Sequence, residues 1–332
     1  MKRVTLRDVA QAAGVSASAV SRTFTPGASI AAQTRDRVLA AAKSLGYRPN
    51  AIARGLISNR TDLVALVTGT IASPYDPLLV DALARGLARI DKRIMLLPVD
   101  GATTVADAME IALDYRVSGA MVAAGTMTAE TSRRFASLGV PLVLAGRIGE
   151  GELVDCVCSD NLAGGRSAAS LLARTGHRRI AYLGRTRNTF SDQERFQGLV
   201  EGLARHGLTL HAERRIEEAA EDLSATMAIL GGDSPPDALF CVNDALAMQA
   251  LEASRLLGIR VPEDLAVIGY DDIPQARWPS FRLTTIAYPV PVTVAAILER
   301  LAARIADPTR PRSVTRIPAE LVVRDTTRRL SP

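Results

Sequence analysis

The residues best suited to chemistry stand after short apolar runs of the chain. Arg195 lies a short distance beyond IAYLG, Asn243 follows ALFCV, and Asp271 follows VIGY. Their guanidinium, amide and carboxylate groups suit the hydroxyls of a sugar-like ligand. Each also has a structural alternative, because Asp271 could cap a turn, Asn243 a helix, and Arg195 could be a solvated helix residue. Further polar residues after such runs are Ser73, Tyr75, Asp76 and Arg147.

Residues for enzymatic catalysis are sparse by comparison. None of the histidines, His177, His206 and His211, stands with a serine or cysteine in a nucleophile elbow. Neither an HExxH sequence nor a P-loop occurs, and the pair Asp271-Asp272 lacks further metal ligands nearby, so it predicts a turn. We therefore expect no enzyme, no cofactor and no bound metal.

Basic residues are concentrated at the N-terminus. Residues 1–60 hold ten lysines or arginines against two acids, although the whole chain has a net charge of only +5. The remaining residues carry 30 basic against 33 acidic side chains. This local excess predicts a polyanionic partner such as nucleic acid, and a solvated basic surface without a partner is the alternative.

Cysteine spacing and hydropathy bear on the compartment. Cys156, Cys158 and Cys241 show neither a disulfide framework nor CxxC spacing, which fits a reducing cytoplasm. The first residues lack the apolar core of a signal peptide, and no run approaches the roughly 20 apolar residues of a membrane span. We expect a cytoplasmic protein without membrane contact, which disfavours the rival hypothesis of a transport-associated binding protein.

Two short helices are predicted near the N-terminus. Thr5 and Asp8 form a capping box, and Gly14 ends the apolar pattern of the first helix. Ser16 can cap a second helix that runs to about Phe24. Two short helices around such a turn form a helix-turn-helix, whose second helix enters the major groove of DNA and touches bases with its first exposed residues. These residues would be Ala17, Ser18 and Arg22.

A third helix is predicted over about residues 34–45. It places Val38, Ala41, Ala42 and Leu45 inward and completes a three-helix module, residues 1–48. Beyond it the chain breaks at Pro49, and residues 49–61 are predicted to form a hinge helix and a linker.

Four ordered blocks carry a family resemblance: VTLRDVAQAAGVSASAVSRTF, LGYRPNAIARGL, TGHRRIAYLG and VPEDLAVIGYDDIPQARWPSFRLTTI. In this order and at these distances they strongly resemble the LacI/GalR family of bacterial transcription regulators, over the whole chain. One helix-turn-helix match alone would be weak, whereas four ordered blocks are highly specific. The resemblance implies a sequence-specific regulator, often a repressor, that binds a palindromic operator as a homodimer, and the sequence leaves a tetramer open.

The resemblance also implies which residues contact DNA. The base contacts fall on the three positions named above, of which Arg22 could donate two hydrogen bonds to guanine. Ala53 and Leu56 match residues that insert into the minor groove. Ala31 stands where the family often has a capping serine, so the third helix lacks a cap worth about 1 kcal/mol. Positions that match phosphate contacts, each with a structural alternative as cap, surface hydroxyl or core aromatic, are Thr5, Ser16, Ser21, Tyr47 and Asn50.

From Leu63 the chain alternates short apolar runs with helical patterns, which predicts an α/β fold with parallel sheets. A comparable series begins near Asn161, so two similar lobes are expected. The resemblance implies a two-lobed, periplasmic-binding-protein-like domain with crossovers near Asp160, Tyr288 and Ala319. It would comprise residues 62–332, with lobes of about 62–160 with 289–319 and 161–288 with 320–332.

The polar residues after the strands match the effector pocket of the family, and Asp160 and Tyr288 near the crossovers are further candidates. A sugar, a polyol or a sugar acid would be the effector. Purine-sensing relatives carry an aromatic platform at the position of Arg147, which an arginine does not reproduce. A ligand that bears carboxylate or phosphate is therefore one hypothesis for this chain.

Overall fold

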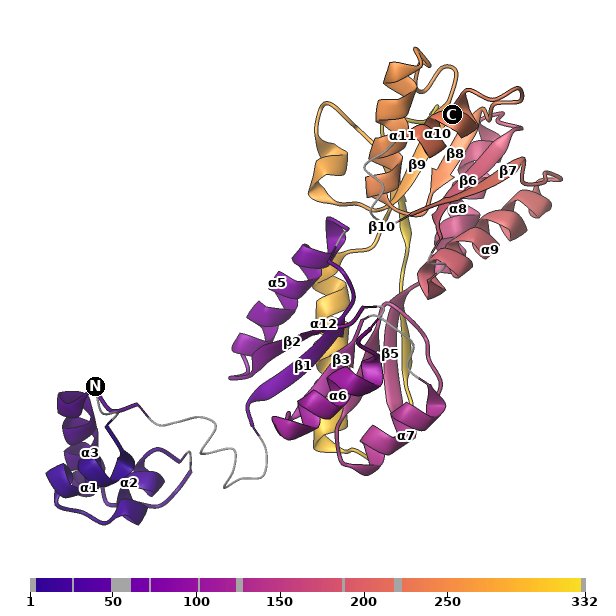
Figure 1. Ribbon diagram of the computed structural model, residues 1–332. Helices are drawn as coiled ribbons and strands as arrows, with labels where there is room; N and C mark the ends of the chain where they lie inside the picture. The colour runs from indigo at the N-terminus through magenta and orange to yellow at the C-terminus, as the bar shows by residue number, and fades with distance from the viewer. Residues whose placement is uncertain are drawn as a thin grey trace. The chain divides into compact units, whose positions relative to one another are not determined.

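A computed structural model describes residues 4–25, 27–48, 61–71, 73–100, 102–123, 128–186, 189–217 and 223–329 of the chain. The chain forms two compact units, Met1–Asp62 and Leu63–Pro332. The described part of the first unit is helical, and the second unit contains two sheets flanked by helices (Figure 1).

Three helices of the first unit pack around a small core. The core takes one fully buried valine from each helix, Val9, Val20 and Val38. Burial of side chains of this size stabilises a fold by roughly 1.5–3 kcal/mol each. The helices are α1 (Leu6–Ala13), α2 (Ala17–Thr23) and α3 (Ala32–Leu45).

The ends of α1 and the start of α2 are set by local chemistry, as predicted. The Thr5 hydroxyl accepts a hydrogen bond from the Asp8 N–H, and the Asp8 carboxylate accepts one from the Thr5 N–H at 2.7 Å. Gly14 ends α1 with a φ of 62°, the left-handed conformation that glycine adopts readily. The Ser16 hydroxyl caps α2. The capping box and the helix-turn-helix are therefore confirmed.

Helix α3 ends at Leu45 as predicted, but its start and the orientation of Leu45 differ from the prediction. It begins at Ala32 rather than near Thr34, and Ala31 at the cap position has no side-chain oxygen that could accept a hydrogen bond. The prediction that Leu45 faces inward is wrong, because its side chain is 37 % exposed. The ring of Tyr47, just after the helix, covers the core instead.

The first sheet of the second unit has the strand order β11-β5-β4-β3-β1-β2, and every pairing is parallel. Helices α5 and α12 pack against each other on one face, and α6 and α7 lie on the other (Figure 1). Gly86 permits the close contact of α5 with α12, because a Cβ there would lie 2.4 Å from a methyl carbon of Leu298. The elements are β1 (Leu63–Thr68), α5 (Tyr75–Ala88), β2 (Arg93–Pro98), α6 (Val105–Asp114), β3 (Gly119–Val122), α7 (Ala129–Ser137), β4 (Leu142–Ala145), β5 (Val154–Ser159), α12 (Val290–Ala306) and β11 (Val314–Ile317).

The second sheet has the order β12-β10-β9-β8-β6-β7. All its pairings are parallel except that of β10 with β12, which is antiparallel. The elements are α8 (Asn161–Arg174), β6 (Ile180–Arg185), α9 (Phe190–Arg205), β7 (Ala212–Ile216), α10 (Ser224–Leu230), β8 (Ala238–Cys241), α11 (Asp244–Leu256), β9 (Ala266–Asp271), the 3-10 helix η1 (Pro274–Arg277), β10 (Thr284–Ala287) and β12 (Glu320–Val322).

The two sheets define two lobes, which the chain connects between β5 and α8, between β10 and α12, and between β11 and β12. Side chains tie the lobes together beside these connections. The hydroxyls of Ser159 on β5 and Tyr270 on β9 lie 2.7 Å apart. Arg316 on β11 donates to both carboxylate oxygens of Glu194 on α9, at 2.7 and 2.9 Å.

A buried ion pair fixes α12 to the first sheet. Asp155 on β5 and Arg304 on α12 are almost fully buried, and their side chains approach to 2.9 Å. The same carboxylate accepts a hydrogen bond from the Ser313 N–H at 2.8 Å, just before β11. In the described part of the chain, no helix has the length and apolar character needed to cross a membrane.

Candidate functional site

The exposed face of α2 presents the three side chains predicted to contact bases. Ala17, Ser18 and Arg22 are all exposed, and their spacing places them on one side of the helix. The Ser18 hydroxyl lies 2.9 Å from that of Ser16, and the Arg22 Nε donates to the Ser18 carbonyl at 3.4 Å. An exposed guanidinium on such a helix can donate two hydrogen bonds to a guanine edge.

The hydroxyls predicted to contact phosphates have structural roles as well. Those of Thr5 and Ser16 accept hydrogen bonds from helix N-termini, as the capping alternative requires. Ser21 is half-buried, and the ring of half-buried Tyr47 lies 5.9 Å from that of Phe24. The remaining predicted DNA contacts, Asn50, Ala53 and Leu56, lie outside the described residues.

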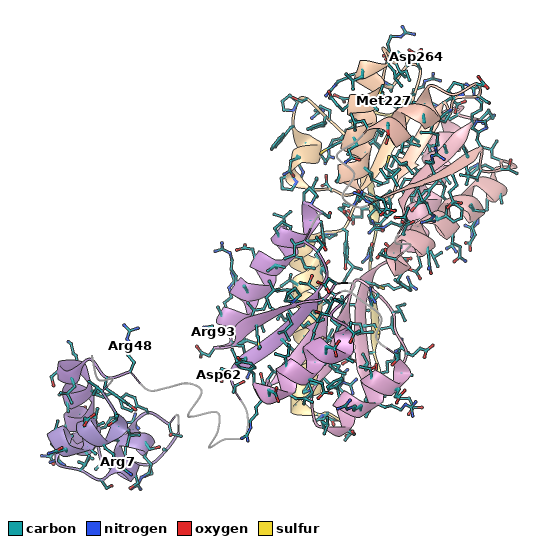
Figure 2. The ribbon with its side chains drawn as sticks, viewed as in Figure 1. Arg7, Arg48, Asp62, Arg93, Met227 and Asp264 are labelled. Atoms are coloured by element: carbon teal, nitrogen blue, oxygen red, sulfur yellow. The ribbon has the colours of Figure 1, made fainter. Side chains whose placement is uncertain are left out.

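Positive charge is spread over the surface of the first unit. Arg7, Arg35, Arg37, Lys43 and Arg48 are all exposed, and Figure 2 shows Arg7 and Arg48 projecting from the unit. Neutralisation of phosphates by such side chains supplies most of the affinity of a protein for DNA of any sequence. The surface therefore suits a nucleic-acid partner.

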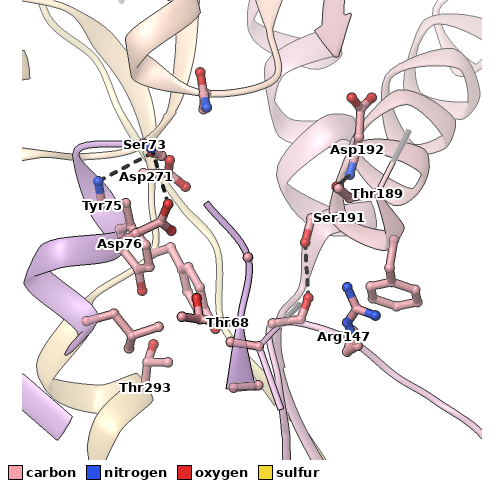
Figure 3. Close-up of a pocket in the computed structure, with 18 of the residues that line it drawn as sticks. Thr68, Ser73, Tyr75, Asp76, Arg147, Thr189, Ser191, Asp192, Asp271 and Thr293 are labelled. Atoms are coloured by element: carbon pink, nitrogen blue, oxygen red, sulfur yellow. Dashed lines mark hydrogen bonds between the residues drawn. The ribbon is translucent and has the colours of Figure 1, made fainter. Parts of the chain in front are cut away.

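The second unit contains a cavity of about 640 Å³, which is lined from both lobes at the carboxyl ends of β1, β4, β6, β8 and β9 (Figure 3). Small-molecule sites of parallel α/β folds are found at this edge of the sheet, and a volume in this range is typical of them. The predicted residues that line the cavity are Ser73, Tyr75, Asp76, Arg147, Arg195, Asn243, Asp271 and Tyr288.

Arg195 on α9 is a buried residue of the cavity lining. Its Nε donates to the side-chain oxygen of Asn161 at 2.9 Å, and one terminal nitrogen donates to the Val242 carbonyl at 2.6 Å. The other terminal nitrogen lies 3.5 Å from an Asp271 carboxylate oxygen. The guanidinium carbon lies 3.5 Å from the centre of the Tyr270 ring. The alternative of a solvated helix residue is therefore wrong for Arg195.

Asp271 is a buried carboxyl held in an unusual backbone conformation. Burial raises its pKa to about 7, although Arg195 opposes the rise, and the negative charge of Asp76 adds to it. The φ of Asp271 is 114°, a region that residues other than glycine seldom occupy. The next residue, Asp272, fixes the turn through an ion pair with Arg324. Because the pKa of Asp271 lies near neutral pH, its carboxyl can both donate and accept hydrogen bonds there.

Two aromatic side chains form one wall of the cavity. The rings of Tyr75 and Tyr288 are stacked, with centres 5.3 Å apart and planes at 12°. Burial raises the pKa of both hydroxyls. Within the described ranges, the Tyr75 hydroxyl has no hydrogen-bond partner, although it is buried. A stacked pair of this kind offers a flat apolar face together with polar edges.

Asn243 and Asp160 both cap helices. The Asn243 side chain accepts from the Leu246 N–H at 3.0 Å at the start of α11, so the helix cap is confirmed. Asn243 also lines the cavity, and its contact with an effector stays a prediction. Asp160 accepts from the Ala163 N–H at 3.2 Å at the start of α8. Asp160 is not among the described residues that line the cavity.

Sequence interpretation missed the end of β6 and the start of α9. Thr189, Ser191 and Arg185 line the cavity, and the Ser191 hydroxyl donates to the Gly146 carbonyl of the other lobe at 3.1 Å. The available signal was Thr189, a helix-capping residue that closely follows a predicted strand. Within the described ranges, no group of histidine, cysteine, aspartate or glutamate side chains is placed to hold a metal ion.

Comparison with known proteins connects both units to one family. The family described as bacterial regulatory proteins, lacI family, matches residues 5–50, and a periplasmic binding protein-like domain matches residues 169–327. The HTH-type transcriptional regulator GalS of Salmonella typhimurium is 34 % identical over 304 residues, which cover 90 % of this chain and 89 % of that protein. The HTH-type transcriptional repressor PurR of Vibrio vulnificus is 30 % identical over 332 residues, which cover 98 % of this chain and 99 % of that protein.

A solved structure gives the same result for the fold. The lac repressor dimer bound to operator and the anti-inducer ONPF has a TM-score of 0.87 to this chain at 26 % identity, and the match covers 98 % of this chain and 99 % of that one. These relatives are regulators of transcription and not enzymes. The chain therefore belongs to the lacI family of bacterial regulatory proteins and is a DNA-binding transcriptional regulator.

Proposed function

We propose that the protein is a repressor that binds a palindromic operator as a homodimer and responds to a small polar effector, which is a sugar, a polyol or a sugar acid. The observation that carries the proposal is the cavity of the second unit, whose lining includes Arg195, Asn243 and Asp271. The same chain exposes the base-contacting face of α2. Support for repression and dimerisation comes from relatives, since PurR is a transcriptional repressor and the lac repressor structure is a dimer on its operator.

On DNA, α2 lies in the major groove and Arg22 selects a guanine. Ser18 adds a less selective hydroxyl, and Ala17 contacts a thymine methyl. Ala53 and Leu56 insert into the minor groove, which favours an operator with a flexible central step. The phosphate contacts are Thr5, Ser16, Ser21, Tyr47 and Asn50.

In the cavity, the effector forms hydrogen bonds with Asp271, Asn243 and Arg195. Its ring or carbon chain lies against the Tyr75–Tyr288 pair. Because the cavity is lined from both lobes, an effector that contacts both favours one arrangement of the lobes over others. Coupling of this kind typically changes affinity for the second ligand by about 5- to 150-fold.

The test is selection from a random duplex library by the full chain at about 0.15 M salt, where non-specific charge contacts are weakened. We expect enrichment of a palindrome whose half-sites lie about one DNA turn apart. Arg22→Ala should weaken binding by about 1–3 kcal/mol and relax one base position in each half-site.

The matched control for this variant is Arg37→Ala, which removes an exposed arginine of α3 outside the base-contacting face. It should leave the selected sequence unchanged, with at most a uniform loss of affinity. Enrichment of no sequence, with and without a bacterial metabolite extract, would refute operator recognition. An unchanged base preference in Arg22→Ala would refute the role of that residue.

A further inference from the structure

Charged side chains divide the cavity into two ends. At one end Asp76, at the start of α5, lies near Asp271, at the end of β9, with Ser73 beside them (Figure 3). The Ser73 N–H donates to the Asp76 carboxylate at 3.2 Å. At the other end Arg147 lies beside Ser191, at the start of α9 (Figure 3). The lining thus has an end with two carboxyl groups, where Arg195 pairs with Asp271, and a basic end at Arg147.

A second arginine belongs to the basic end. Arg185 is the last residue of β6, and its N–H donates to Asp192 in the first turn of α9 at 2.9 Å. One terminal nitrogen of its guanidinium donates to the Glu217 carbonyl at 3.1 Å, and the other N–H groups are the donors that a ligand would use. Arg147 follows Gly146, whose carbonyl accepts from the Ser191 hydroxyl in the same turn. Both arginines line the cavity, Arg147 from the first lobe and Arg185 from the second.

The acid at the basic end, Asp192, is already engaged by other groups of the protein. One carboxylate oxygen accepts from the Tyr182 hydroxyl at 2.7 Å and from Arg215 at 3.0 Å, and the other accepts from the Arg185 N–H. The side chain is 1 % exposed. The positive charge of the two arginines is reinforced by the N-terminus of α9, where the helix dipole favours an anion.

We propose that the effector is a polyhydroxylated anion, whose carboxylate or phosphate binds between Arg147 and Arg185 while its hydroxyls face Asp76 and Asp271. This inference rests on the effector site proposed above. Guanidinium groups bind both kinds of anion through paired N–H donors, whereas carboxylates accept hydrogen bonds from hydroxyls and repel a negative charge. The two ends therefore fix the direction in which the ligand lies.

The same arrangement explains how this ligand would act on the protein. Its anionic group contacts one arginine from each lobe, next to the Ser191–Gly146 hydrogen bond that joins the lobes. An uncharged sugar of the same size gains no such contact at this end. Because a ligand shifts an equilibrium only by its differential contacts, the charged group is the part of the effector that favours the joined arrangement.

The test is thermal unfolding of the full chain with matched pairs of probes at equal ionic strength. The pairs are D-gluconate with D-sorbitol and glucose 6-phosphate with glucose. The single tryptophan, Trp278, lies in the second unit and reports its unfolding by fluorescence. We expect one anionic probe to raise the melting temperature at concentrations where its neutral partner does not. A response to gluconate identifies a carboxylate ligand, and a response to glucose 6-phosphate identifies a phosphate ligand.

Variants assign the response to the basic end. Arg147→Gln and Arg185→Gln should each weaken binding of the active probe by about 10- to 100-fold, the range expected for a lost charged hydrogen bond. Arg147→Lys should retain part of the affinity for the active probe. Arg133→Gln, on the exposed face of α7, is the matched control and should bind as the wild type does. The melting temperature without probe shows whether each variant is folded.

Several results would overturn the inference: no response to either anionic probe, equal or stronger responses to the neutral probes, or undiminished binding in both glutamine variants. A response to the neutral probes alone would support the proposed effector site but refute the anionic ligand. Selection of DNA uses no probe, so a failure of the proposed regulator function would be visible separately.

Discussion

Replacement of Asp271 by asparagine should remove a pH dependence from the unfolding of the second unit. Burial raises the pKa of Asp271 from the ordinary value of 3.8 to about 7 in the folded protein. The folded state therefore binds a proton more tightly than the unfolded chain between these two values. Stability must fall as the pH rises through this range, and the penalty is complete above the folded pKa.

The size of the effect follows from the two pKa values. Relative to a group that stays neutral, the carboxyl destabilises the fold by about 2 kcal/mol at pH 5 and about 4 kcal/mol at pH 8. Between pH 5 and pH 8 the wild type should therefore lose about 2–3 kcal/mol of unfolding free energy that Asp271→Asn retains. The variant also removes a partner of Arg195, but the guanidinium stays charged throughout the range, so that loss is equal at both pH values and cancels.

Urea unfolding at pH 5 and pH 8, followed by the fluorescence of Trp278, measures this difference. Protein concentration must be equal in all samples, because association would shift the apparent stability. Asp264→Asn serves as control, since this carboxyl is exposed and its hydrogen bond with Arg260 lowers its pKa, so no such loss is expected. The reasoning would be refuted if the unfolding free energies of wild type and Asp271→Asn changed equally between pH 5 and pH 8. It would also be refuted if the wild type became more stable relative to the variant towards pH 8.

Two further substitutions test the architecture. Ala31→Ser should supply the missing cap of α3, because Ala31 has the extended backbone of a cap residue, and should stabilise the first turn by about 1 kcal/mol; slower amide hydrogen exchange of Thr34 in the full chain is the expected result, and an unchanged rate would contradict it. Asp155→Asn should destabilise the second unit by about 3–5 kcal/mol, because it leaves Arg304 charged and buried without its partner; a urea midpoint within error of the wild type, by circular dichroism, would show that the pair is dispensable.

The parts of the fold that could be predicted are those in which local chemistry decides. The start of α1 depends on Thr5 and Asp8, which lie close together in the sequence, and its end depends on Gly14, so the sequence sufficed there. The orientation of Leu45 could not be predicted in the same way. Helical periodicity places it inward, but the chain after the helix brings Tyr47 over the core, which is a matter of tertiary packing.

The candidate site divides along the same line. Asn243 and Asp271 were found because parallel strands bring their carboxyl ends to one edge, whatever the details of packing. Ser191 and Arg185 were missed because their place in the cavity depends on how the start of α9 approaches the loop after β4, in the other lobe. No local pattern encodes an approach between two lobes.

The turn at Asp271 lowers the stability of the fold in two ways. A buried carboxyl with a raised pKa destabilises the protein at neutral pH, and positive φ values at Asp271 and Asp272 add backbone strain. The conformation persists because Arg324 and Arg277 pair with Asp272 and Asp244 accepts the Ile273 N–H at 2.9 Å. Strain that neighbours hold in place is characteristic of binding sites. A variant that is more resistant to alkaline unfolding but no longer responds to its effector would therefore identify the carboxyl as a group retained for binding at the expense of stability.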